Sequence, residues 1–225
     1  HFLNGLGLFN QLNFPAAENE FCRALGLMPD RVSVLTNLSA TLIRLGKFSE
    51  AIEFANKAVS LDAQSVDGWL NLGICLNEAS SFDQALAAYD KVLAINPQHV
   101  EAWTNRGITF NDMNRLADAL LAYDKALSIQ PRHAEAWYNR GITYNRMQRH
   151  DEALQACDRA LDIDPGHVKA WTNRGVTLEH LSRCEEALAA YDKVLHLDPR
   201  HADAWANRGA TLNSLGRYEQ ALASC

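Results

Sequence analysis

The stretch Glu101–Gly107 reads EAWTNRG, and close copies of it recur along the chain. They are EAWYNRG at 135–141, KAWTNRG at 169–175, DAWANRG at 203–209 and, less closely, DGWLNLG at 67–73. Successive copies begin 34 residues apart. A fixed period of this length is typical of a solenoid, in which each repeat is one small unit that stacks on the next.

Other positions follow the same period. We number each repeat so that the tryptophan is at position 4, which gives complete repeats at 32–65, 66–99, 100–133, 134–167 and 168–201 and partial repeats at 1–31 and 202–225. Position 8 is almost always glycine, position 20 is always alanine, position 24 is most often aromatic, and position 32 is usually proline. Agreement between independent positions makes the repeat a strong signal.

The spacing within a repeat predicts two helices. Positions 4, 8 and 11 lie on one stripe of a first helix, and positions 20, 24 and 27 lie on one stripe of a second. Small residues at positions 8 and 20 let the two backbones approach, while tryptophan and tyrosine fill the space around that contact. Proline at position 32 ends the second helix. Each repeat is therefore a helical hairpin that buries its apolar face by stacking on its neighbours.

This combination of tryptophan, glycine, alanine, aromatic residue and proline resembles the tetratricopeptide repeat (TPR) family over essentially the whole chain. The resemblance implies an all-α, right-handed solenoid of antiparallel helical hairpins. We expect a single solenoid spanning residues 1–225.

Asparagine occupies position 6 of every repeat that contains this position within 32–225. Position 6 is about 200° around the helix from positions 4 and 8, so these side chains point away from the hairpin interior. The row resembles the asparagine ladder of the O-linked N-acetylglucosamine transferase superhelix, which implies a concave groove whose carboxamides pair with the backbone of an extended peptide. The alternative is that each asparagine bonds a neighbouring helix and sets the repeat spacing. The row is Asn37, Asn71, Asn105, Asn139, Asn173 and Asn207.

Neighbouring positions on the same face would add selectivity for particular ligand side chains. The candidates from positions 2, 5 and 9 are Glu101, Glu135, Lys169, Thr104, Tyr138, Thr172, Ile108 and Ile142. The carboxylate clamp of co-chaperone TPR domains is not expected, because the chain has no lysine at position 5, no asparagine at position 9 and no arginine at position 6.

Arginine occupies position 7 only where the preceding second helix carries aspartate at position 25. This correlation predicts ion pairs between successive repeats rather than a basic stripe for ligands. The predicted pairs are Asp90/Arg106, Asp124/Arg140, Asp158/Arg174 and Asp192/Arg208.

Histidine recurs at position 34, as His99, His133, His167 and His201. Equivalent points on successive repeats lie about 10 Å apart, which is too far for a shared zinc ion. We therefore expect these histidines near the start of the first helix. Cys157 and Cys225 replace the aromatic residue at position 24, so we expect them in the core. No catalytic set, metal site or cofactor is predicted, and we expect no enzymatic activity within this chain.

Composition limits the possible partners. The formal net charge of −6 disfavours nucleic acid and anionic membranes. No apolar run approaches the ~18 residues of a membrane span. Five scattered cysteines without a CxxC pair indicate reduced thiols and a cytoplasmic protein.

The expected function is a protein-interaction module that binds an extended peptide or protein segment. The alternative is the substrate-recruiting arm of a larger glycosyltransferase, or of another multidomain enzyme whose catalytic part lies outside this chain. The chain has no initiator methionine and opens on HFLNGLGLFN without a signal-peptide pattern, so we expect it to be part of a longer protein. Uncapped repeat ends are expected to allow self-association.

Overall fold

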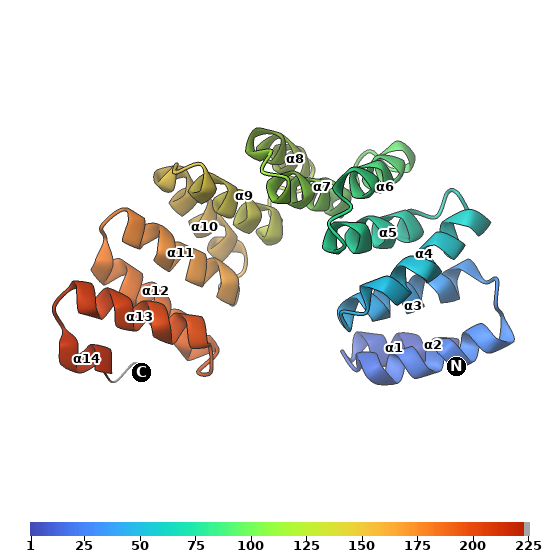
Figure 1. Ribbon diagram of the computed structural model, residues 1–225, viewed down its shortest axis with the longest axis horizontal. Coiled ribbons are helices and arrows are strands. Elements are labelled where there is room, and N and C mark those ends of the chain that lie inside the picture. Colours follow the sequence, from blue (N-terminus) through green and yellow to red (C-terminus); the bar gives the residue numbers. More distant parts are fainter. Residues whose placement is uncertain (223–225) are drawn as a thin grey trace. The chain divides into compact units, whose positions relative to one another are not determined.

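The computed structural model describes residues 1–222, which form fourteen helices and no strand. The chain folds into two compact units, His1–Met113 and Asn114–Cys225. Within each unit the helices are stacked in chain order, and each helix packs on the next (Figure 1). The described part of the chain is thus an α-solenoid of helical hairpins.

The odd-numbered helices are the first helices of their repeats and are called A helices, and the even-numbered ones are called B helices. The first unit contains α1 (Phe2–Asn10), α2 (Phe14–Leu27), α3 (Val32–Arg44), α4 (Phe48–Leu61), α5 (Val66–Glu78), α6 (Phe82–Ile95) and α7 (Val100–Asp112). The second contains α8 (Leu116–Ile129), α9 (Ala134–Arg146), α10 (His150–Ile163), α11 (Val168–His180), α12 (Cys184–Leu197), α13 (Ala202–Ser214) and α14 (Tyr218–Leu222).

The interior of a hairpin is built around the small residue at position 8. A Cβ atom placed on Gly73 would lie 2.4 Å from Cε1 of Tyr89, which is buried at position 24 of the same repeat. Ser39 takes the place of this glycine in α3, and its hydroxyl donates a hydrogen bond to the carbonyl of Ala51 at 3.0 Å. The predicted close approach of positions 8 and 20 is therefore confirmed.

Helix ends follow local sequence signals. The B helices that precede a proline at position 32 end two residues before it, as Ile95 does before Pro97. Each turn from an A helix to its B helix contains one residue with a positive φ. These residues are Leu12, Gly46, Ser80, Asn114, Gln148, Ser182 and Gly216, with φ between 56° and 72°. Glycine adopts this left-handed conformation without strain, whereas leucine or glutamine adopts it at a cost.

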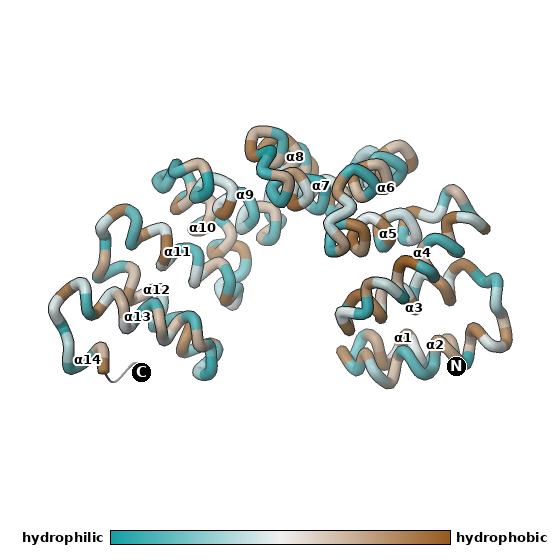
Figure 2. The backbone as a smooth tube through the Cα atoms, viewed as in Figure 1, coloured by the Kyte–Doolittle hydropathy of each residue, from teal (hydrophilic) through white to brown (hydrophobic). Residues whose placement is uncertain are grey.

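The tryptophans at position 4 are half-buried rather than fully enclosed. The indole N–H of Trp103 donates to the carbonyl of Pro97 at 3.0 Å, and Trp137 donates in the same way to Pro131 at 2.9 Å. Each tryptophan thereby ties the start of an A helix to the turn before it. Apolar and polar residues alternate along the helices, as expected for helices that bury one stripe (Figure 2).

Candidate interaction surface

The predicted site residues lie on A helices that are neighbours within each unit. In the first unit α3 packs beside α5 and α5 beside α7, and in the second α11 packs beside both α9 and α13. Equivalent positions on these helices therefore come next to one another within a unit. A side chain on these helices is available to a ligand only where it does not already make a hydrogen bond within the protein.

Two members of the asparagine row bridge successive repeats. Asn71 is 8% exposed, and its Nδ2 donates to the carbonyl of Thr36 on the preceding A helix at 3.0 Å. Asn173 donates to Sγ of the buried Cys157 at 3.3 Å, and its Oδ1 accepts a hydrogen bond from Asn145 at 3.1 Å. These two carboxamides hold neighbouring helices together.

Two other members bond their own helix. Nδ2 of Asn37 donates to the carbonyl of Ser33 at 2.7 Å. Nδ2 of Asn139 donates to the carbonyl of Glu135 at 2.9 Å and to its carboxylate at 3.1 Å. Such bonds to the preceding turn are local and do not join one helix to another.

Asn105 and Asn207 differ from the rest of the row. Both are half-buried, and neither carboxamide makes a hydrogen bond to any residue that the structure describes. Each therefore keeps both a donor and an acceptor available.

The charged candidates at position 2 lie at the surface. Glu101 and Lys169 are exposed, whereas Glu135 lies 3.3 Å from Nε2 of His167. The hydrogen bond with His167 holds the pKa of the Glu135 carboxyl below its ordinary value, and the bond from Asn139 acts in the same direction. Glu135 is thus ionised, and its carboxylate already interacts with His167 and Asn139.

The candidates at positions 5 and 9 vary in accessibility. Thr104 is 3% exposed and its hydroxyl donates to the carbonyl of Val100 at 2.9 Å, so it lies beneath the surface. Thr172 is half-buried and donates to Val168 at 3.1 Å. Ile108 and Ile142 are half-buried.

Tyr138 at position 5 packs against His167. The two ring centroids are 4.9 Å apart, and burial raises the pKa of the Tyr138 hydroxyl to about 12. The hydroxyl therefore stays protonated near neutral pH and can donate a hydrogen bond.

All four predicted ion pairs between successive repeats are present. Arg106 reaches Asp90 at 3.4 Å, and the remaining distances are 3.2 Å for Arg140/Asp124, 2.7 Å for Arg174/Asp158 and 2.7 Å for Arg208/Asp192. Each guanidinium also lies over the tryptophan three residues earlier, at 5.1–5.9 Å from the ring centroid. These arginines join repeats and are not available as a basic stripe.

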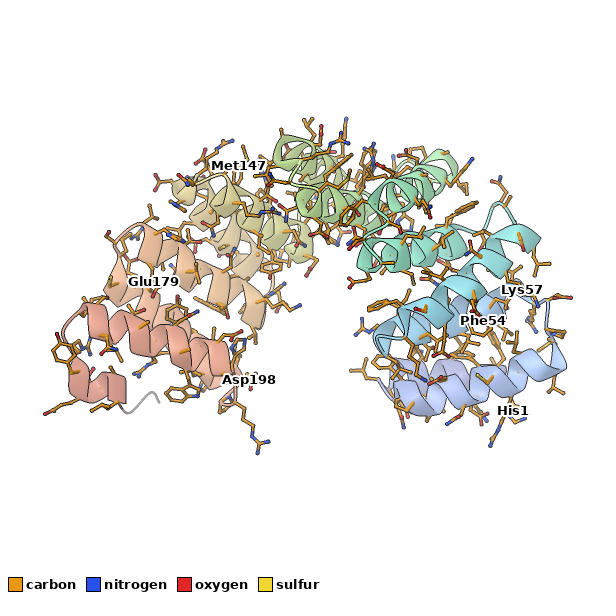
Figure 3. All side chains as sticks on the ribbon, in the orientation of Figure 1. His1, Phe54, Lys57, Met147, Glu179 and Asp198 are labelled. Atoms are coloured by element: carbon orange, nitrogen blue, oxygen red, sulfur yellow. The ribbon has the colours of Figure 1, made fainter. Side chains whose placement is uncertain are left out.

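A second polar row, at position 12, was missed by the sequence reasoning. Nδ2 of Asn145 donates to Oγ1 of Thr177 on the next A helix at 2.6 Å as well as to Asn173. Glu179, labelled on α11 in Figure 3, takes the equivalent place and accepts hydrogen bonds from Thr211 and from Tyr191. The recurrence of asparagine at position 12 was the available signal.

The four histidines at position 34 lie at the starts of the A helices, as predicted, and each one is the N-cap of its helix. Nδ1 of His99 accepts a hydrogen bond from the backbone N–H of Ala102 at 3.2 Å, and the other three do the same at the starts of α9, α11 and α13. Among residues 1–222, no group of three or more histidine, cysteine, aspartate or glutamate side chains is placed to hold a metal ion.

Two of the cysteines, Cys75 and Cys157, are buried. Cys157 is buried, as predicted, whereas Cys225 lies outside the described residues. Burial raises the pKa of the Cys75 and Cys157 thiols to about 12. These two thiols are therefore packing groups rather than nucleophiles.

None of the helices within the described range is both long enough and apolar enough to cross a membrane.

Several solved structures are similar in fold. A tetratricopeptide repeat protein from Parabacteroides merdae has a TM-score of 0.74 at 21% identity, covering 99% of this chain and 88% of that one. MamA gives 0.60 at 23% identity over 78% and 96% of the two chains. YrrB, described as a TPR protein with an unusual peptide-binding site, gives 0.56 at 23% identity over 82% and 95%. At these identities the likeness concerns the fold alone. A search of curated proteins found no match.

Models of the tetratricopeptide repeat match most of the sequence. One matches residues 66–99, 100–133 and 134–167, a second matches 32–65, and a third matches 156–189 and 190–223. Together with the helical hairpins described above, these matches show that the chain belongs to the tetratricopeptide repeat family.

Proposed function

We propose that this chain is a protein-interaction module that binds an extended peptide segment across the outward faces of the A helices within a unit. It contributes no catalytic step, and its place is the cytoplasm, where free thiols persist. The observation that carries the proposal is the pair of uncommitted carboxamides, Asn105 and Asn207. A carboxamide can donate to and accept from a peptide backbone, so it binds a segment largely without regard to its side chains.

In this proposal some asparagines of the row bind the peptide, and others set the spacing of the repeats. Asn71 and Asn173 set the spacing of neighbouring helices through the bonds described above. Asn105 and Asn207 meet the ligand, and Asn139 can join them by exchanging its local bond.

Selectivity comes from side chains beside the row. Glu101 and Lys169 offer opposite charges in different units, Ile108 and Ile142 offer apolar contact, and Tyr138 offers a protonated hydroxyl. Thr104 and Thr172 support their own helices and act indirectly.

The test selects peptides from a random library displayed on phage and measures their affinity for purified variants. N105A and N207A are compared with Q84A and Q155A, which remove exposed carboxamides from the B helices α6 and α10. Each selected peptide is expected to lose affinity for at least one asparagine variant by about 2- to 12-fold, the worth of one hydrogen bond of roughly 0.5–1.5 kcal/mol.

The glutamine variants are expected to bind like the wild type, and circular dichroism establishes that all four variants are folded. If every selected peptide binds N105A and N207A as tightly as the wild type, the asparagine row is not the binding element.

A further inference from the structure

The outward faces of α5 and α7 carry the same pattern of side chains. Positions 9 and 13 follow position 2 by seven and eleven residues, so each points within about 20° of the direction of position 2 on a helix. Both helices read carboxylate, isoleucine, carboxylate along this stripe. The residues are Asp67, Ile74 and Glu78 on α5 and Glu101, Ile108 and Asp112 on α7, and together they define the α5–α7 face.

The carboxylates of this face have no basic partner on α5 or α7. All four are exposed, the two isoleucines are half-buried, and α5 packs directly beside α7. The only lysine or arginine in these two helices is Arg106, which pairs with Asp90 and lies over Trp103. None of the four carboxylates makes an ion pair within residues 1–222, and the one hydrogen bond to them is from Asn77 to Asp112.

The same positions on α9 and α11 of the second unit have mixed charge. The stripe on α9 is Glu135, Ile142 and Arg146, and the stripe on α11 is Lys169, Val176 and His180. The two units also differ in net charge. Residues 1–113 contain 12 acidic and 7 basic residues, a net charge of −5, whereas residues 114–225 contain 15 and 14, a net charge of −1. The negative charge of the protein is therefore concentrated in the unit that carries the α5–α7 face.

We propose that the α5–α7 face binds a basic extended segment of a partner protein. This inference rests on the proposed function and names the chemistry of its ligand. A backbone held by Asn105 in the middle of the face places its side chains toward the two acidic edges, which are about 16 Å apart along each helix. The aliphatic stem of a lysine lies on Ile74 or Ile108 while its ammonium reaches a carboxylate.

Other occupants fit this face less well. Among the described residues, no three of these carboxylates are grouped closely enough to hold a divalent cation, whose oxygen ligands lie within about 2.6 Å of the ion. Nucleic acids and anionic lipids are repelled by four like charges. An acidic or neutral peptide would leave the carboxylates without partners.

The test measures binding of three fluorescent ten-residue peptides by anisotropy, in which valine alternates with lysine, glutamate or serine. Wild type is compared with E78Q/E101Q, and with the control E53Q/D83N, which removes two exposed carboxylates from α4 and α6 and changes the net charge equally. The lysine peptide is expected to bind most tightly and to weaken in high salt.

For that peptide E78Q/E101Q is expected to raise Kd by about 2- to 30-fold, the range for two exposed ion pairs. The control is expected to change Kd by less than about twofold, because distant exposed charges are screened.

The outcomes separate this inference from the function beneath it. If the serine or glutamate peptide binds as tightly as the lysine peptide, or if both double variants weaken binding equally, the assignment of a basic ligand is wrong while peptide binding stands. If none of the three peptides binds wild type, both the inference and the peptide-binding surface are refuted.

Discussion

Substitution of the glycine at position 8 by alanine tests the packing of the hairpins, and the chain supplies its own control. A Cβ atom on Gly175 would lie 2.4 Å from Cε1 and 2.7 Å from Cζ of Tyr191. On Gly141, where position 24 is cysteine, the new Cβ would lie 3.1 Å from Sγ of Cys157 and 3.3 Å from the carbonyl of Ala153. The first contact requires a ring to move, whereas the second requires only a small shift.

The magnitude follows from the comparison of the two variants. Tyr191 is fully buried and its hydroxyl donates to Glu179 at 3.0 Å, so the ring has little freedom to yield. Overpacking of this kind costs about 1–3 kcal/mol. Replacing a helical glycine by alanine also gains about 1 kcal/mol, and this gain is common to both variants and cancels. Gly175→Ala is therefore expected to be about 1–3 kcal/mol less stable than Gly141→Ala.

Urea unfolding followed by circular dichroism measures the difference, with thermal unfolding as a second readout. A loss of 1–3 kcal/mol corresponds to a fall in Tm of about 2–12 °C for a protein of this size. Midpoints are compared rather than extrapolated free energies, because repeat proteins do not always unfold in one step. Equal midpoints, or a higher midpoint for Gly175→Ala, would refute this account of the hairpin interior.

Three further predictions concern single contacts. A double-mutant cycle on Asp158 and Arg174, which lie 2.7 Å apart and are partly exposed, is expected to give a coupling energy of about 0.5–1 kcal/mol, and zero coupling would contradict the ion pair. His201→Ala is expected to cost about 0.5–2 kcal/mol in urea unfolding, and His201→Asn less, because asparagine also accepts a cap hydrogen bond; equal losses would argue against capping. Because burial raises the pKa of Cys75 and Cys157 to about 12, iodoacetamide at pH 8.5 is expected to label them only after unfolding, and rapid labelling in the native protein, detected by peptide mass spectrometry, would contradict their burial.

Features that depend on the repeat alone could be predicted from the sequence. The hairpins follow from the 34-residue period, and the ion pairs follow from the way arginine at position 7 accompanies aspartate in the preceding repeat. The place of His99 at the start of a first helix was also predicted, and the structure adds that its ring nitrogen accepts a backbone hydrogen bond there.

The states of the individual asparagines could not be predicted in this way. A helical projection gives the direction of a side chain but not the distance to the next helix. Asn71 comes close enough to the carbonyl of Thr36 to be buried, whereas Asn105 makes no such bond. The asparagines at position 12 differ in the same way, since Asn77 bonds Asp112 whereas Asn145 bonds Asn173 and Thr177. Packing between repeats determines which hydrogen bonds these asparagines make, and the 34-residue period alone does not predict it.

The ion pairs between repeats have the same spacing at successive junctions, so one repeat can replace another at this contact. Asp158 and Arg174 are 16 residues apart, as are Asp192 and Arg208. Deletion of residues 168–201 would bring Asp158 to the same separation from Arg208, and His167 would become the cap of the helix that begins at Ala202. A gene that loses or duplicates one of the 34-residue repeats within residues 100–201 therefore keeps the aspartate–arginine pairs and the histidine caps at the new junction, so the length of the chain can change without loss of these contacts.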